Sequence, residues 1–250
     1  MKKTQLPRHP LQAQSEAHRV VIVGTGEQAA IAFEYLTYDS PHEVVAFSAD
    51  AEHLPQGGYC GLPAVPLDQL ARDYPPATHR VFVAVSATRL NRLRRRLFDD
   101  VRAAGFGCIS YVSSQAFVWP SVPIGANSLV FEDCTIQRGA SVGDNVILWS
   151  GACVAHSSVI EDDCCLAPHA AVAGFSRVGS GSFLGINCCV ADTVSIASDC
   201  VVGAGAVVIA DTKPRQVYVG NPARATGKDS FEAFGVTGSE RAASSEQSEG

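Results

Sequence analysis

Residues 142–178 read VGDNVILWSGACVAHSSVIEDDCCLAPHAAVAGFSRV, and every sixth residue of this stretch is Val, Ile or Leu. Extended in both directions, the same spacing selects sixteen branched aliphatic residues: Val118, Ile124, Val130, Ile136, Val142, Leu148, Val154, Ile160, Leu166, Val172, Val178, Leu184, Val190, Ile196, Val202 and Val208. The residues two positions before them, from Val122 to Ala206, are all small or medium in size. A period of six fits neither the helical period of about 3.6 nor simple alternation, so it predicts a short strand and a turn that repeat without interruption.

This repeat predicts a parallel β-helix from about Val112 to Val208. Three hexads close one triangular coil, so the sixteen hexads give about five coils, more than the roughly three repeats that a stable stack needs. The branched residue and the small residue two positions earlier share a side-chain direction, so both are expected inside the prism. We therefore expect some cysteines to pack in the core and others, one residue later, to face outward. The inward cysteines are Cys134, Cys164, Cys188 and Cys200, and the outward ones are Cys153, Cys165 and Cys189.

The N-terminal part of the chain follows a different pattern. An apolar strand, RVVIVG at 19–24, leads into the turn Gly24-Thr25-Gly26 and then a helical segment. A second strand ends near Asp50, and a third, RVFVAVS at 80–86, precedes an amphipathic helix. This order predicts a small parallel α/β sheet. We expect four segments: a disordered tail over 1–18, the α/β domain over 19–110, the β-helix over 111–225 and a disordered tail over 226–250.

The glycine turn is the candidate ligand site of this sheet. Ligands bind at the carboxyl ends of parallel strands, where glycine lets the backbone approach a phosphate and the next helix N-terminus favours its charge. We therefore expect Gly24, Thr25, Gly26 and Asp50 to contact a substrate. The alternative is a turn that only joins strand to helix. The arginines at positions 92 and 94–96 interleave with an apolar stripe and are expected to form a solvated helix face.

Composition narrows the possible partners. The net charge of −6 and pI of about 5.6 argue against nucleic-acid binding, which requires a basic face, and favour a small-molecule partner. No apolar stretch is long enough to span a membrane, and residues 1–18 lack the apolar region of a secretory signal, so we expect a cytoplasmic protein. The nine cysteines include no CxxC, so no metal is expected.

Two histidines and one tryptophan are candidates for chemistry within the repeat. His156 and His169 occupy turn or outward positions, where the alternative to a functional role is an ordinary exposed turn residue. Trp149 faces outward beside Leu148, and the pattern leaves two interpretations open: a contact between subunits or a platform for a sugar ring.

Five segments together resemble a known family. They are VVIVGTG at 20–26, VAHSSVIEDDC at 154–164, AVAGFSRVGSGSFLGINCCV at 171–190, VVGAGAVVIAD at 201–211 and VYVGNPA at 217–223. Over residues 19 to about 225 the chain resembles the sugar O- and N-acyltransferases related to sialic acid acetylation and bacillosamine N-acetylation enzymes. The resemblance implies a Rossmann-like domain followed by a left-handed β-helix, acetyl-CoA as co-substrate, a nucleotide-linked sugar as acceptor, a role in surface glycan biosynthesis, and a homotrimer.

The resemblance also implies site residues. His156 would be the general base that takes the proton from the attacking sugar hydroxyl or amine, and backbone N–H groups near Gly174 would hold the oxyanion. The segment from Tyr218 to Ala223 would close the CoA end. CoA would contact Cys165, His169, Gly174, Gly185, Ile186 and Ala204, while Trp149 would join Gly24, Thr25, Gly26 and Asp50 in binding the substrate.

The sequence departs from the family at several of these places. Ala155 and Ser157 flank His156 where relatives often carry a carboxylate, which leaves Glu161 and Asp162 as candidates to orient the base. Cys165 stands where relatives often have a second histidine. Trp149 stands where the amino-sugar enzymes have an asparagine, so the acceptor atom, oxygen or nitrogen, stays open.

Three other functions compete with acyl transfer. A γ-class carbonic anhydrase-like enzyme would use the same helix, but it needs three zinc-binding histidines and this repeat has two. A non-catalytic scaffold would use the β-helix as a rod and bind no CoA. An oxidoreductase built on the glycine turn would need a larger dinucleotide domain than this one.

Overall fold

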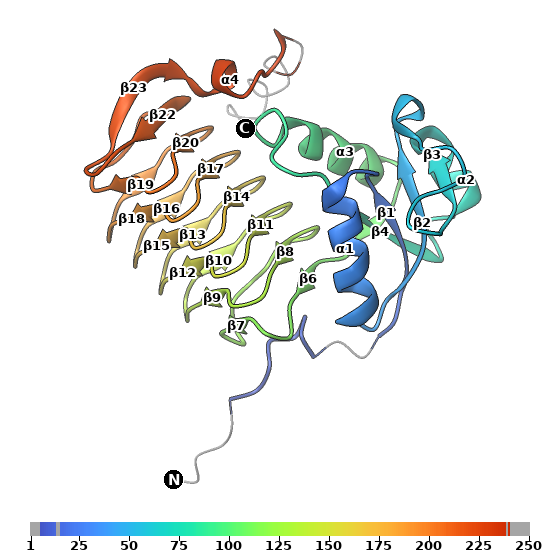
Figure 1. Cartoon of the computed structure of the whole chain (residues 1–250). Coiled ribbons are helices and arrows are strands. Elements are labelled where there is room, and N and C mark those ends of the chain that lie inside the picture. The colour runs from blue at the N-terminus through green and yellow to red at the C-terminus, as the bar shows by residue number, and fades with distance from the viewer. Residues whose placement is uncertain (1–5, 14–15, 239, 241–250) are drawn as a thin grey trace.

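The computed structural model describes residues 6–13, 16–238 and 240, in which an α/β layer lies beside a β-helix (Figure 1). The α/β layer is a five-stranded parallel sheet in the order β3-β2-β1-β4-β5. Its elements are β1 (Arg19–Val23), α1 (Glu27–Tyr38), β2 (Glu43–Ala49), η1 (Ala51–His53), β3 (Ala64–Pro66), η2 (Leu67–Gln69), α2 (Leu70–Asp73), β4 (His79–Val83), α3 (Arg92–Ala103) and β5 (Gly107–Cys108).

Alternation along β1 gives this sheet two buried faces. Val20 and Ile22 pack with α1 in one core cluster, whereas Val21 and Val23 pack with α3 and Leu70 in another. Helices therefore cover both faces, as expected for a parallel sheet.

The β-helix is a three-faced prism built from two-residue strands. One face has eight strands, with the C-terminal strand antiparallel: β6 (Tyr111–Val112), β8 (Leu129–Val130), β11 (Ile147–Leu148), β14 (Cys165–Leu166), β17 (Phe183–Leu184), β20 (Val201–Val202), β22 (Gln216–Val219) and β23 (Arg224–Asp229). The six-stranded face contains β7 (Phe117–Val118), β9 (Thr135–Ile136), β12 (Cys153–Val154), β15 (Ala171–Val172), β18 (Cys189–Val190) and β21 (Val207–Val208). The four-stranded face contains β10 (Ser141–Val142), β13 (Val159–Ile160), β16 (Arg177–Val178) and β19 (Ser195–Ile196).

The chain visits these faces in a fixed order, which defines three corners. The first corner joins the eight-stranded face to the six-stranded face, as at 149–152. The second joins the six-stranded face to the four-stranded face, as at 155–158, and the third, as at 161–164, returns to the eight-stranded face.

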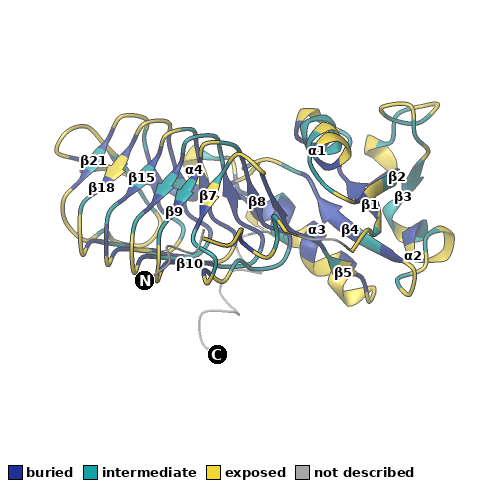
Figure 2. Cartoon of the chain, turned by 90° about the horizontal axis from the view of Figure 1, so that it is seen from below, coloured by how far each residue is buried: buried dark blue, intermediate teal, exposed yellow. Residues whose placement is uncertain are grey.

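The register confirms the repeat predicted from the sequence. Strands of successive coils pair in parallel with residues eighteen positions apart, as in Leu148 with Leu166 and Leu166 with Leu184. The branched residues and the small residues two positions earlier are buried along the whole prism, apart from the half-buried Ile124, and Cys134, Cys164, Cys188 and Cys200 lie in this core. Figure 2 shows buried segments on successive coils of the prism.

The α/β layer covers the outward side of part of the eight-stranded face. Leu129, Ile147 and Cys165 point out of the prism but share a buried cluster with Val20 and Phe47 of the sheet. Cys165 faces out of the prism as predicted but is only 2% exposed, so its predicted contact with CoA finds no open surface there. The physical reason is that the N-terminal layer packs over this face.

Helix α3 docks on the third corner through its arginines. Arg95 pairs with Asp163 at 2.6 Å, Arg92 pairs with Asp199, and the buried Arg94 donates to the Cys164 carbonyl at 3.2 Å. The prediction of a solvated arginine face is therefore wrong for these three residues, because the helix packs its basic side against the β-helix. Arg96 remains half-exposed and pairs with Asp50 and Asp100.

A ladder of polar side chains continues from this dock along the third corner. Asn127 bonds both backbone groups of Val83 at the end of β4 and donates to Asn145 at 2.8 Å. Asn145 donates in turn to Asp163 at 2.7 Å, which also accepts from Arg95. The ladder ties the end of β4 and helix α3 to the same coils.

Both ends of the described chain contact the β-helix. His9, within the predicted tail 1–18, is buried, and its Nε2 lies 2.9 Å from the Val122 carbonyl oxygen. Near the other end, β23 and α4 (Ser230–Ala233) bury Phe231 beneath Arg92 and Arg215. The remaining predicted tail residues, 1–5, 14–15, 239 and 241–250, lie outside the described part. Within that part, no helix is both long and apolar enough to cross a membrane.

Candidate active site

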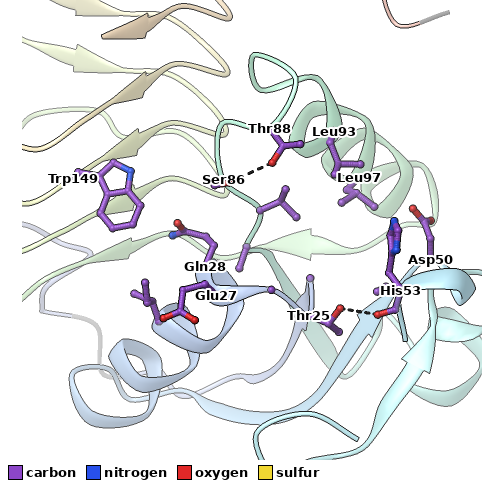
Figure 3. Close-up of a pocket in the computed structure, with 16 residues that line it drawn as sticks. Thr25, Glu27, Gln28, Asp50, His53, Ser86, Thr88, Leu93, Leu97 and Trp149 are labelled. Atoms are coloured by element: carbon purple, nitrogen blue, oxygen red, sulfur yellow. Dashed lines mark hydrogen bonds between the residues drawn. The ribbon is translucent and has the colours of Figure 1, made fainter. Parts of the chain in front are cut away.

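A cavity of about 620 Å³ lies where the α/β layer meets the first corner of the β-helix (Figure 3). It is lined by the turn after β1, by the ends of β2 and β4, by one side of α3 and by the β-helix turn after β11. All five residues predicted to bind substrate line it, namely Gly24, Thr25, Gly26, Asp50 and Trp149. The structure therefore brings together residues that are more than a hundred positions apart in the sequence.

The glycine turn needs its glycine for a steric reason. Gly24 has φ of +133°, and a Cβ there would lie 2.6 Å from the carbonyl oxygen of Ala84. Gly26 caps α1 and provides no side-chain acceptor for the N–H groups of the first turn. The positive end of α1 therefore faces the cavity without a side-chain cap, an arrangement that suits a phosphate.

Polar groups line the part of the cavity around Asp50 and His53, on the side away from Trp149. The Thr25 hydroxyl donates to the His53 carbonyl at 2.9 Å, and the Asp50 carboxylate accepts from Arg96 at 2.5 Å. Ser86 and Thr88, whose hydroxyl oxygens lie 3.3 Å apart, add two further hydrogen-bonding groups after β4. This end of the cavity offers a carboxylate, a histidine and hydroxyls to a polar ligand.

Trp149 forms the β-helix side of the cavity. Its ring stacks on Phe131 with centroids 4.6 Å apart and an angle of 5° between the planes. Cys165 packs in the same buried cluster as this ring, and burial raises the pKa of its thiol. The indole is thus fixed in orientation, and the neutral, buried Cys165 is unsuited to act as a nucleophile.

His156 lies at a different place, on the second corner. Its side chain is exposed, and its ring meets Phe175 edge-on at a centroid distance of 5.1 Å. The main chain of His156 is held on both sides, since its N–H donates to Gln137 Oε1 at 2.9 Å and its carbonyl accepts from Phe175. The imidazole lies over Gly174 of the next coil, where a Cβ would overlap the ring.

Neither proposed acid orients this histidine. Glu161 pairs with Arg177 and accepts from the Ser180 N–H, and Asp162 accepts from the Asp144 N–H at 2.8 Å. Both acids lie at the third corner, so the suggestion that one of them contacts His156 is wrong. In the described residues no carboxylate forms an ion pair with His156.

Most of the predicted CoA contacts follow one edge of the prism. His169, Ile186 and Ala204 are exposed turn residues on successive coils at the first corner, and Gly185 lies at the same corner but is buried. This edge leads away from the Trp149 coil towards the C-terminal end. Gly174 instead lies beside His156 at the second corner, and Cys165 is buried under the α/β layer.

Several cavity residues were missed by sequence reasoning. They are Glu27, Gln28, Ile31, Ala49, His53, Ala84, Val85, Ser86, Thr88, Leu93 and Leu97. Ser86 and Thr88 directly follow an apolar strand, a position that signals a sheet-edge ligand site. Gln28 and Leu93 belong to helical stretches whose cavity side is set by docking, so no local signal marks them. In the described residues no group of three or more His, Cys, Asp or Glu side chains is placed to hold a metal.

Solved structures place the chain among enzymes of known class. It is 31% identical to perosamine N-acetyltransferase from Caulobacter crescentus, solved with CoA and GDP-perosamine, over 84% of this chain and 97% of that one, with a TM-score of 0.74. It is 26% identical to the acetyltransferase domain of PglB from Neisseria gonorrhoeae, solved with acetyl coenzyme A, over 84% and 100% of the two chains, with a TM-score of 0.73. WeeI from Acinetobacter baumannii, at 20% identity and a TM-score of 0.55 over 83% and 99% of the chains, shares the fold. No protein-family profile matches the chain.

The architecture and these similarities define an acyltransferase of the hexapeptide-repeat type, and the parallel sheets fit a left-handed β-helix. The chain belongs to the family of hexapeptide-repeat sugar acetyltransferases.

Proposed function

We propose that the protein transfers an acetyl group from acetyl-CoA to a hydroxyl or amino group of a nucleotide-linked sugar, and that it serves surface glycan biosynthesis. The observation that carries this proposal is the single cavity that gathers Gly24, Thr25, Gly26, Asp50 and Trp149. The strand order of the sheet that borders this cavity, β3-β2-β1-β4-β5, resembles that of Rossmann-like nucleotide-binding domains. In such domains the pyrophosphate lies at the N-terminus of the first helix. The similar enzyme from Caulobacter crescentus was solved with GDP-perosamine and CoA, which supports both substrates.

In this proposal His156 is the general base. The sugar oxygen or nitrogen attacks the thioester carbonyl, His156 takes its proton, and the C–S bond breaks to release CoA. Backbone N–H groups near Gly174 would stabilise the oxyanion. The donor would lie along the first-corner edge past His169, Ile186 and Ala204.

The positions of these groups favour an assembly of several copies. The cavity lies at the first corner and His156 at the second, with the six-stranded face between them. Within one chain His156 is therefore one prism face away from the cavity that would hold its substrate. A homotrimer would solve this separation by placing the second corner of one copy beside the first corner of another.

The test measures CoA release with acetyl-CoA and a panel of nucleotide sugars that carry free amines or hydroxyls, with GDP-perosamine included. We expect turnover by the wild type and a loss of about 100-fold or more in kcat for His156→Asn, within the range for a general base. His18→Asn is the matched control, because this half-buried histidine lies outside both the cavity and the CoA edge. Undiminished activity of His156→Asn would exclude the base, and absence of thioester turnover with every acceptor would favour a scaffold.

A further inference from the structure

Gln28 is a buried polar residue whose role the fold does not explain. It is the second residue of α1, lines the cavity and is only 7% exposed. Its Nε2 has no hydrogen-bond partner among the described residues. Of the buried side-chain atoms without a partner in that part of the chain, it is the one that belongs to a cavity-lining residue.

A buried amide without a hydrogen-bond partner destabilises the protein unless a ligand forms the missing hydrogen bond. An unmade hydrogen bond at a buried donor carries a desolvation penalty, and such groups in folded proteins call for a specific explanation. The last torsion of a glutamine is soft, so its amide can turn towards a ligand at little energetic cost.

Gln28 and Trp149 lie on the same side of the cavity, opposite Asp50 and His53 (Figure 3). Thr25, in the glycine turn before α1, lies between these two ends in the same view (Figure 3). A nucleotide whose phosphates lie at the α1 N-terminus would therefore extend its far substituent towards Gln28 and Trp149. That end is also the one beside the β-helix.

Trp149 is built to accept a flat, apolar surface. One face of its ring is covered by Phe131, which is only 1% exposed, and the side chain packs against the buried cluster that contains Phe131 and Cys165. An indole held in this way can pack against the C–H face of a sugar ring, which requires an apolar surface and a rigid partner.

We propose that Gln28 and Trp149 form the acceptor-sugar subsite, with the sugar ring on the indole and the Gln28 amide donating to a sugar oxygen. The subsite selects a sugar with one face free of polar substituents, such as a deoxy sugar. This inference rests on the proposed function, because it assumes a nucleotide sugar in the cavity. It assigns the sugar end to these two residues and leaves the nucleotide end to Asp50 and His53.

Gln28→Met is the decisive variant, because Met has nearly the same length and removes only the unpartnered amide. Calorimetric titration compares GDP with GDP-perosamine, and UDP with UDP-N-acetylglucosamine, on wild type and variant. We expect about tenfold weaker binding of the nucleotide sugar and less than a twofold change for the matching nucleoside diphosphate. The melting temperature of the ligand-free variant should be unchanged or higher, whereas a purely structural glutamine would lower it. Gln69→Met, outside the cavity, is the matched control.

Equal weakening of both ligands, or no weakening of either, would overturn the subsite. A second measurement uses the wild-type cavity in a Trp119→Phe background, where Trp149 is the remaining tryptophan. Its emission should change more with the nucleotide sugar than with the diphosphate, and equal responses would also overturn the subsite. Binding without acetyl transfer would refute the proposed function alone, and no binding of either nucleotide would refute both.

Discussion

Gly174→Ala should disable His156 while leaving the fold almost intact. Gly174 has ordinary backbone angles, so alanine causes no backbone strain, yet its Cβ would overlap three atoms of the His156 imidazole. The main chain at position 156 is fixed by Gln137 and Phe175, so the ring itself has to move. An off-rotamer side chain costs roughly 0.5–1.5 kcal/mol, which lowers the melting temperature of a chain of this size by about 1–6 °C.

The effect on catalysis should be much larger. Misplacement of a reacting group by about 1 Å can lower the rate about 100-fold, so kcat for CoA release should fall by that factor while binding of the nucleotide sugar is unchanged. The control is Gly174→Ala in a His156→Ala background, where the methyl group has no imidazole to displace. If the substitution lowered kcat as strongly in that background, the reasoning that it acts through His156 would be refuted.

Two further predictions concern stability. Asp163→Ala removes the acceptor shared by Arg95 and Asn145 in a buried network, so the free energy of unfolding in urea should fall by roughly 3–5 kcal/mol, and a loss below about 1 kcal/mol would contradict the ladder. Burial alone would raise the pKa of Asp39, but hydrogen bonds, including one from Tyr111, lower it below 3.8. Its stabilisation is therefore present above about pH 4 and is lost as the pH falls through the lower pKa of the folded protein. Asp39→Asn should then differ from wild type in urea at pH 7 and converge with it near pH 2, and an equal difference at both values would exclude this linkage.

The β-helix could be predicted from the sequence because its register is local. Each coil repeats the same inward positions, so Val154 and Cys164 are placed by counting, and the pairing eighteen residues apart agrees with that count. The glycine turn was also recognisable, since a strand, a Gly-rich turn and a helix in that order place Gly24 at the carboxyl edge of a sheet.

What the sequence could not show depends on how the two layers dock. Cys165 and Cys189 occupy equivalent outward positions in the repeat, yet the α/β layer covers one and leaves the other exposed. Arg94 belongs to a helix with the pattern of a solvated face, and only the β-helix behind it explains its burial. The same docking turns Gln28 towards the cavity. The separation of His156 from that cavity likewise follows from the order of the prism corners.

The polar ladder at the third corner has a consequence for protein engineering. Exchange of the α/β layer with that of a relative is an obvious route to a different nucleotide preference. Here the grafted layer would also need the β-helix residues that bind it. Asn127 hydrogen-bonds to Val83 at the end of β4, and Asp163 accepts a hydrogen bond from Arg95 of α3. Trp149 closes the ligand cavity from the repeat as well. The exchangeable unit is therefore the sheet together with the turns of the first coils beneath it, and a crossover placed between Cys108 and Tyr111 would divide it.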